Sequence, residues 1–144
     1  MKPVMRSMTH FSKSAAETEA IGGELSKILL GGECIALDGP LGAGKTQFVR
    51  GLATALGANP RAVSSPTFVL LNIYRGGRLT VFHLDAYRVT GPEDFEGIGF
   101  GELLEQGGVV VVEWAGRIAE ILPATRINIA IEVLGESERQ ITIR

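Results

Sequence analysis

Residues 39–46 of this 144-residue chain read G-P-L-G-A-G-K-T, a full match to the phosphate-binding pattern G-x-x-x-x-G-K-[ST]. Glycine lets a backbone approach a phosphate without a Cβ in the way, so that successive N–H groups can point into one concavity. Lys45 supplies a point charge for the terminal phosphates, and the hydroxyl of Thr46 can be one of the few protein ligands of Mg²⁺. These residue types at this spacing predict a site for a nucleoside triphosphate.

The segments on both sides of this loop agree with that interpretation. Residues 33–38 (E-C-I-A-L-D) are typical of a short buried strand, and apolar residues recur at helical spacing between the loop and Gly57. A helix that starts at the loop would add unpaired N–H groups and a dipole that favour an anion. The residues that we expect to contact the nucleotide are Leu41, Gly42, Ala43, Gly44, Lys45, Thr46 and Gln47.

Two carboxylates are candidates for the other half of the site. Glu113 ends a run of four valines, which is typical of a central parallel strand covered on both faces. Because open α/β sheets bind ligands at the carboxyl ends of their strands, Glu113 could hold Mg²⁺ or position an attacking water, and the alternative is a solvated strand-end carboxylate. Asp85 ends a second strand and could orient the metal or the water, or simply cap a turn before Tyr87.

Three further features adjoin these candidates. Residues 64–67 (S-S-P-T) form a hydroxyl-rich turn that could reach the terminal phosphate and change shape on hydrolysis, although such turns are common in loops. His83 lies within an apolar strand, which favours a structural histidine whose hydrogen bonds are satisfied. Trp114 could pack beside the nucleotide or fill the core, and the sequence leaves both open.

The elements that must position these residues alternate between strand and helix. A capping-box pattern at residues 14–17 opens a helix that carries apolar residues to Leu29 and closes at residues 31–32. The remaining expected elements are a hairpin-like pair at 68–74 and 79–85, helices from 92, over 100–106 and over 115–122, and a closing hairpin at 126–133 and 139–144. This order predicts one α/β domain over residues 1–144, with three layers and a mixed sheet whose central strands are parallel and whose edges are antiparallel.

Composition limits the class of protein further. The chain is 45% apolar, and 14 basic against 16 acidic residues give a net charge of −2, which provides no dedicated surface for nucleic acid or membrane. The single cysteine, Cys34, lies in an apolar strand and is expected to be a reduced core residue. No segment has the pattern of a signal peptide or a transmembrane span, so we expect a soluble, cytoplasmic protein.

Four segments together resemble the TsaE family, small bacterial ATPases needed to make threonylcarbamoyladenosine in transfer RNA. They are G-P-L-G-A-G-K-T at 39–46, S-S-P-T-F at 64–68, H-L-D-A-Y-R at 83–88 and V-E-W at 112–114, in the family's order and spacing. The resemblance implies that ATP is the nucleotide, that Thr46 and Glu113 hold Mg²⁺, and that Asp85 and Thr67 lie near the reacting phosphate together with Lys45. It also implies adenine contacts around residues 14–15 or the turn at Gly135.

The resemblance further implies partners. The family works with TsaB and TsaD; TsaD transfers the threonylcarbamoyl group to the adenosine beside the anticodon, and the ATPase sustains repeated cycles, so that tRNA is contacted only through the complex. Two positions depart from the family pattern: Pro40 replaces a common Asp, and Ala115-Gly116 replaces Pro-Glu. The first removes one N–H from the outer part of the loop, and the second removes an acid beside Glu113.

Three alternatives remain at this point. A GTPase is disfavoured, because the D-x-x-G string at residues 94–97 follows no buried strand and no Asn-Lys-x-Asp motif is present. A small-metabolite kinase would use Asp85 as base and Arg88 as a clamp on the phosphate acceptor, although the chain leaves little room for an acceptor site. A nucleotide-gated binding module with negligible turnover would use the same residues as an ATPase and would differ only in its rate of hydrolysis.

Overall fold

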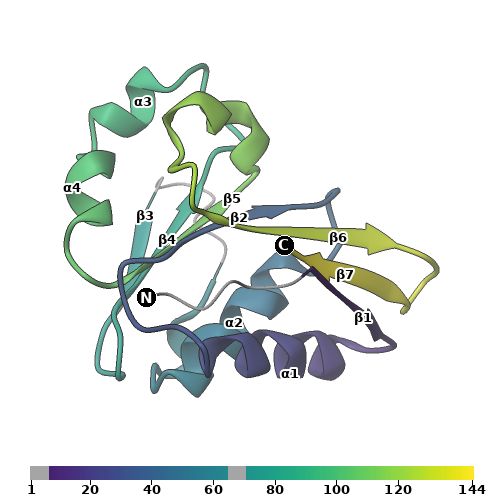
Figure 1. Ribbon diagram of the computed structural model, residues 1–144. Coiled ribbons are helices and arrows are strands. Elements are labelled where there is room, and N and C mark those ends of the chain that lie inside the picture. Colours follow the sequence, from purple (N-terminus) through teal and green to yellow (C-terminus); the bar gives the residue numbers. More distant parts are fainter. Residues whose placement is uncertain (1–6, 65–70) are drawn as a thin grey trace.

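One seven-stranded sheet, in the order β1-β7-β6-β2-β5-β4-β3, is the frame of the computed structural model, which describes residues 7–64 and 71–144 (Figure 1). The strands are β1 (Met8–Ser12), β2 (Cys34–Asp38), β3 (Leu71–Tyr74), β4 (Val81–Asp85), β5 (Val109–Glu113), β6 (Ile127–Val133) and β7 (Arg139–Ile143). The α-helices are α1 (Ala15–Ser26), α2 (Lys45–Ala55), α3 (Glu93–Glu96) and α4 (Phe100–Leu104), and the 3₁₀ helices are η1 (Pro60–Ala62) and η2 (Ala115–Ile121).

The sheet is mixed, as predicted. Strands β6, β2, β5 and β4 are mutually parallel, whereas β3 pairs antiparallel with β4, β7 with β6, and β1 with β7. The four parallel strands occupy the centre. Strands β2, β4 and β5 are covered on both faces, whereas β6 alternates between buried and exposed residues. The predicted arrangement of parallel centre and antiparallel edges is therefore confirmed.

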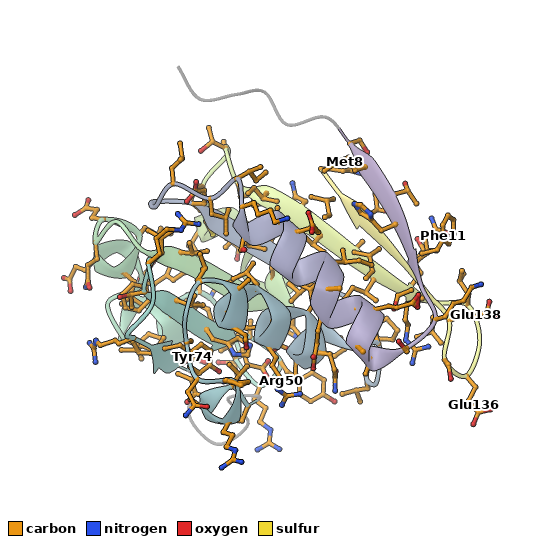
Figure 2. All side chains as sticks on the ribbon, turned by 90° about the horizontal axis from the view of Figure 1, so that it is seen from below. Met8, Phe11, Arg50, Tyr74, Glu136 and Glu138 are labelled. Carbon is orange, nitrogen blue, oxygen red and sulfur yellow. The ribbon has the colours of Figure 1, made fainter. Side chains whose placement is uncertain are left out.

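Two hydrophobic clusters cover the two faces of the sheet and define three layers. One joins α1 and α2 to the sheet through residues such as Leu25, Phe48 and Ile35. The other joins α3, α4 and η2 to the opposite face through residues such as Phe95 and Val112. Figure 2 looks onto the face covered by α1 and α2. Among the described residues, no helix is long and apolar enough to span a membrane.

Close contact between α1 and α2 fixes how α2 sits on the sheet. A Cβ on Gly51 of α2 would lie 1.8 Å from the carbonyl oxygen of Glu19, and one on Gly22 of α1 would lie 2.3 Å from the carbonyl oxygen of Phe48. Both distances are far below any van der Waals contact, so only glycine permits this approach. Because α2 follows the phosphate loop directly, this packing also fixes where the loop ends.

Two expected elements differ in the structure, and one strand was not expected. Helix α1 ends at Ser26 and does not continue to residue 29, because the backbone tightens there into i→i+3 hydrogen bonds: the amides of Lys27, Ile28 and Leu29 bond the carbonyls of Glu24, Leu25 and Ser26. The predicted helix at 115–122 is a 3₁₀ helix with a kink at Ile118. Strand β1 was not predicted, since residues 8–12 become a strand only through pairing with the distant β7. Residues 68–70 of the predicted hairpin lie outside the described residues.

Candidate functional site

The phosphate loop leaves the carboxyl end of β2 and runs directly into α2. Gly42 and Gly44 have φ angles of +78° and +102°, in the left-handed region that favours glycine. A Cβ at Gly42 would meet nothing within 4 Å, so backbone conformation and not crowding requires glycine there. The loop ends at the N-terminus of α2, whose first N–H groups have no helical partners and can bind an anion.

Lys45 is the central cation of this region. Its side chain is 6% exposed, and Nζ donates to the carbonyl oxygens of Gly39 at 2.6 Å and Pro40 at 3.0 Å. The same ammonium lies 4.0 Å from the ring centroid of Trp114. Burial lowers the pKa of Lys45, and the nearby carboxylates, Glu113 foremost, act in the opposite direction. The loop therefore holds a desolvated cation beside the predicted phosphate position.

Glu113 and Asp85 lie side by side at the carboxyl ends of neighbouring parallel strands, since they are paired in the register of β4 and β5. Glu113 is 3% exposed, which excludes the alternative of a solvated strand-end carboxylate. Asp85 also fills the structural role considered for it, because its Oδ1 accepts the Tyr87 amide at 2.8 Å. Burial raises the pKa of Asp85, and the neighbouring charge of Glu113 raises it further.

Glu113 is also the end of a buried hydrogen-bonded chain across three strands. His83 Nε2 bonds the Glu113 carboxylate, and the Tyr74 hydroxyl lies 2.8 Å from His83 Nδ1. The backbone N–H of Ser64 lies 3.4 Å from the Tyr74 hydroxyl oxygen. The Tyr74 hydroxyl also lies 3.0 Å from the Ser64 carbonyl oxygen, which accepts the side-chain amide of Asn72 at 3.2 Å as well. Because the hydroxyl has one proton, we assign it to His83 Nδ1, so that Nε2–H of His83 donates to Glu113. The prediction that His83 is a satisfied structural histidine is confirmed.

Trp114 follows Glu113 in a conformation that side chains rarely adopt. Its φ and ψ angles are 58° and 39°, and it is the one non-glycine residue with positive φ in the described part of the chain. Such a conformation costs on the order of 1 kcal/mol and persists where the surroundings enforce it. Its amide donates to the Leu37 carbonyl at 3.0 Å, and its ring packs against Tyr87 with centroids 4.9 Å apart. The indole is therefore held beside Lys45 and Tyr87.

The oxygen atoms at this edge of the sheet suit Mg²⁺, which in phosphate sites takes only one or two ligands from the protein. Thr46 is half-buried on the first turn of α2, and Glu113 and Asp85 end their strands nearby. Within residues 7–64 and 71–144, no group of three or more His, Cys, Asp or Glu side chains could hold a metal ion. A metal ion at this position would therefore take one or two ligands from the protein and further ligands from a bound phosphate. Thr67 lies outside the described residues.

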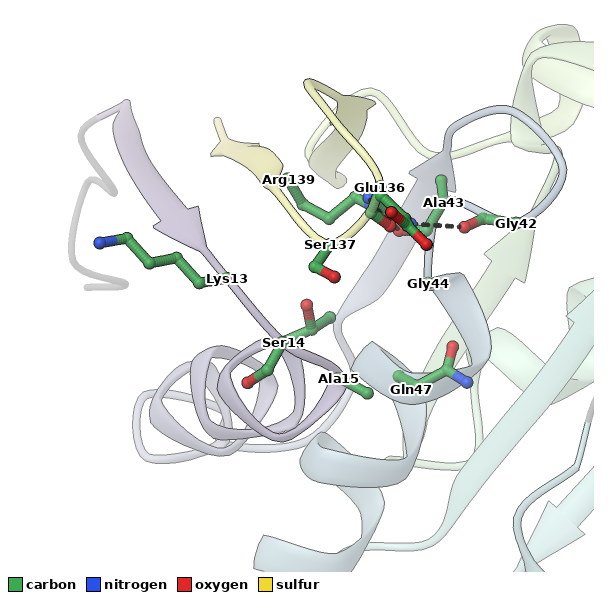
Figure 3. A pocket seen from close by; sticks show the side chains of 11 residues that line it. Lys13, Ser14, Ala15, Gly42, Ala43, Gly44, Gln47, Glu136, Ser137 and Arg139 are labelled. Atoms are coloured by element: carbon green, nitrogen blue, oxygen red, sulfur yellow. Dashed lines mark hydrogen bonds between the residues drawn. The ribbon is translucent and has the colours of Figure 1, made fainter.

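A pocket of about 370 Å³ adjoins the loop, and its lining includes neither Glu113 nor Asp85 (Figure 3). It is bounded by the start of α1, the loop with α2, and the turn between β6 and β7. Its lining residues are Lys13, Ser14, Ala15, Thr18, Gly42, Ala43, Gly44, Gln47, Glu136, Ser137 and Arg139. Both regions considered for adenine, residues 14–15 and the turn at Gly135, thus meet beside the phosphate loop.

Two residues of the site escaped the sequence argument. Asp38 ends β2 immediately before the loop, and its Oδ1 accepts the Gly116 amide at 3.3 Å. Its position at the carboxyl end of a strand was a usable signal, because Glu113 and Asp85 were found by the same criterion. Arg139 contacts the loop from β7, almost a hundred residues away in sequence, and no local pattern marks it.

Comparisons with known proteins agree on one family. The family model described as "Threonylcarbamoyl adenosine biosynthesis protein TsaE" matches residues 12–141. A TsaE protein of Treponema pallidum is 43% identical over 132 residues, which cover 92% of this chain and 96% of that protein. A TsaE protein of Bacillus subtilis is 41% identical over 126 residues, covering 88% of this chain and 78% of that protein. A crystal structure of Bacillus subtilis YdiB superposes with a TM-score of 0.79 at 33% identity, covering 98% of this chain and 86% of that one.

Proposed function

The chain belongs to the TsaE family of tRNA threonylcarbamoyladenosine biosynthesis proteins, and from this premise we propose that it is a Mg²⁺-dependent ATPase that supports TsaB and TsaD in that pathway. One observation carries the ATPase part of the proposal. The phosphate loop with Lys45, the paired carboxylates Glu113 and Asp85, and an open pocket meet at one edge of the sheet. ATP needs these three features, since its phosphates, its reacting centre and its nucleoside are bound separately.

Each part of ATP has a matching part of the site. The N–H groups of the loop and the ammonium of Lys45 bind the phosphates, and the pocket beside residues 14–15 takes the nucleoside. Thr46 and Glu113 would hold Mg²⁺, which when bound neutralises phosphate charge and orients the terminal phosphate. The Asp85 carboxylate is suited to accept a hydrogen bond from the attacking water, because its raised pKa makes it a better proton acceptor than an exposed aspartate.

His83 keeps Glu113 available for this work. It bonds Oε2 of the carboxylate from within the sheet, so that the carboxylate is anchored on one oxygen. Carboxylates near phosphate and metal act in a fixed orientation, and a buried hydrogen-bond donor behind them supplies it. Hydrolysis then depends on residues from β4, β5 and α2, which the packing of the helices on the sheet holds together.

The test is release of phosphate from ATP by the purified chain, alone and with TsaB and TsaD. Lys45→Ala removes the central cation and Glu113→Ala the buried carboxylate, and Lys27→Ala removes an exposed lysine as the matched control. A slow basal rate that rises with the partners, vanishes in the first two variants and persists in the third is the expected result. A rate unchanged by either site variant would refute the ATPase and direct the search to phosphate acceptors.

A nucleotide-gated module without turnover gives a different pattern in the same experiment. Both functions require nucleotide binding through Lys45, but only an ATPase requires Glu113 for phosphate release. Under the ATPase proposal, Glu113→Ala binds nucleotide and fails to release phosphate above background. If the wild-type chain binds ATP and releases no phosphate even with TsaB and TsaD, the gating function replaces it.

A further inference from the structure

The guanidinium of Arg139 connects the phosphate loop to the turn between β6 and β7. Its Nε donates to the carbonyl oxygen of Ala43 at 3.0 Å, and one terminal nitrogen donates to that of Gly42 at 3.2 Å. The other terminal nitrogen donates to the carbonyl oxygens of Gly135 and Glu138, both at 2.9 Å. Figure 3 shows the side chain reaching from β7 to the loop along one wall of the pocket.

All three nitrogens of Arg139 are thus engaged with backbone carbonyls, including that of Glu136 at 3.4 Å. Within the described residues, no carboxylate forms an ion pair with it. A planar guanidinium can bind several carbonyls in a fixed fork, which an ammonium cannot do. The side chain of Arg139 therefore cross-links the backbone of the phosphate loop to that of the β6–β7 turn.

The bonds to Gly42 and Ala43 determine which way the loop amides face. In a trans peptide the C=O and the following N–H point in opposite directions. Because Arg139 holds the Ala43 carbonyl, the N–H of Gly44 is turned away from β7, and the described peptides include no cis bond. The Gly42 carbonyl has the same effect on the N–H of Ala43, which closes the loop turn onto the Pro40 carbonyl at 3.1 Å.

We propose that Arg139 is a positioning residue that holds the phosphate loop in its anion-binding conformation before a nucleotide arrives and joins it to the pocket wall at residues 135–138. This inference rests on the proposed function and deepens it. The apparent affinity of a ligand falls in proportion to the fraction of molecules whose site is in the conformation that binds it. Loss of the fork releases both the loop and the turn, so the phosphate-dependent part of nucleotide affinity falls.

The experiment compares two arginines that do the same structural work at opposite ends of the sheet. Arg78 also donates two bonds to backbone carbonyls, those of Leu29 and Ser26, but away from the loop. Arg139→Met and Arg78→Met are each measured for unfolding midpoint and, by calorimetry, for affinity toward ADP with Mg²⁺ and toward inorganic tripolyphosphate. We expect Arg139→Met to weaken both ligands by about tenfold or more and Arg78→Met to lower only the midpoint.

The conservative variant Arg139→Lys separates the effect of the hydrogen-bonding geometry of the guanidinium from the effect of its positive charge. It keeps the positive charge but not the fork, so we expect it to bind both ligands several-fold more weakly than the wild type. Binding equal to wild type in Arg139→Lys, or a loss in Arg139→Met no larger than in Arg78→Met, would overturn the inference. If Arg139→Met does not fold, the comparison of Arg139→Lys with Arg78→Lys decides in the same way.

Lys45→Ala in the same series keeps the two proposals apart. If Lys45→Ala abolishes ADP binding and the Arg139 variants bind normally, the proposed nucleotide site stands and the positioning role of Arg139 is wrong. If Lys45→Ala binds ADP as the wild type does, the nucleotide site itself is wrong. Affinity for tripolyphosphate reports on the loop without the nucleoside pocket, so an effect confined to ADP would also contradict the role assigned to Arg139.

Discussion

At the scale of single residues, the chain from Ser64 through Tyr74 and His83 to Glu113 shows what a buried carboxylate at this position requires. Tyr74, His83 and Glu113 are buried, so removal of one of them leaves the next without a partner in the core, where an unsatisfied group costs about 1–3 kcal/mol. The chain therefore links the stability of the sheet to the orientation of a predicted catalytic side chain.

Tyr74→Phe tests this link. It removes only the hydroxyl, leaves the buried His83 Nδ1 without its partner, and should lower the free energy of unfolding by about 1–3 kcal/mol. Tyr87→Phe is the matched control, since its ring packs on Trp114 and stays in place. Urea denaturation measures both. Equal stabilities of the two variants would show that the buried chain contributes nothing.

Asp85→Asn should separate stability from activity. The pKa of Asp85 is raised in the folded state, so its ionisation costs stability at every pH above that value, and the cost disappears as the pH falls through it toward 3.8. Asparagine can still accept the Tyr87 amide, so we expect an unfolding midpoint a few degrees higher at neutral pH, with the gain lost in acid. Phosphate release should fall about a hundredfold or more. A variant that is less stable at neutral pH, or equally active, contradicts this.

The sequence predicted the site residues unevenly, and the reason is physical. Lys45, Glu113 and Asp85 were found because a motif and two strand ends mark them, and the structure brings them together. Arg139 could not be found, because its role exists only when β7 and the loop are adjacent in space. The roles of Thr46 and Thr67 remain predictions.

At the scale of elements, the contact between α1 and α2 determines where the loop ends. Gly51→Ala would place a methyl group 1.8 Å from the Glu19 carbonyl, so the helices must separate, and we expect destabilisation of about 1–3 kcal/mol or more. Gly23 lies in α1 with its nearest neighbours at 3.6 Å, an ordinary contact. Gly23→Ala should stabilise the chain by up to about 1 kcal/mol through helix propensity. Thermal unfolding measures both, and a Gly51→Ala variant as stable as Gly23→Ala would show that the contact is not tight.

The elements that the sequence predicted best are those with strong local patterns. The valine run of β5 and the capping box at Ser14, whose hydroxyl accepts the Glu17 amide at 3.1 Å, needed no tertiary information. Strand β1 depended on pairing with β7, and the early end of α1 depended on a change to i→i+3 backbone bonds; no local sequence pattern reveals either.

At the scale of the whole molecule, nucleotide and fold should be linked by mass action. A ligand that binds only the folded chain stabilises it by about 2.7 kcal/mol when present at a hundred times its dissociation constant. We expect ADP with Mg²⁺ to raise the unfolding free energy by about this amount, and to have no effect on Lys45→Ala. Chemical denaturation with and without ligand measures it. A similar gain in Lys45→Ala would place the nucleotide elsewhere.

The class of fold followed from the order of strands and helices, because parallel strands need helical crossovers and hairpins do not. The position of each strand in the sheet did not follow, since the first and last described strands are paired with each other across nearly the full chain. The pairing of strands far apart in sequence depends on the packing of the whole core, and no local sequence pattern indicates it.

Trp114 is the single tryptophan of the chain, and it lies beneath the Lys45 ammonium, against the ring of Tyr87. All intrinsic indole fluorescence therefore originates from one point at the edge of the phosphate loop. A cation on the face of an indole shifts its electronic states, so any ligand that draws the ammonium away alters the emission. The protein thus carries its own optical probe, and occupancy of the loop can be followed in milliseconds by rapid mixing without a label.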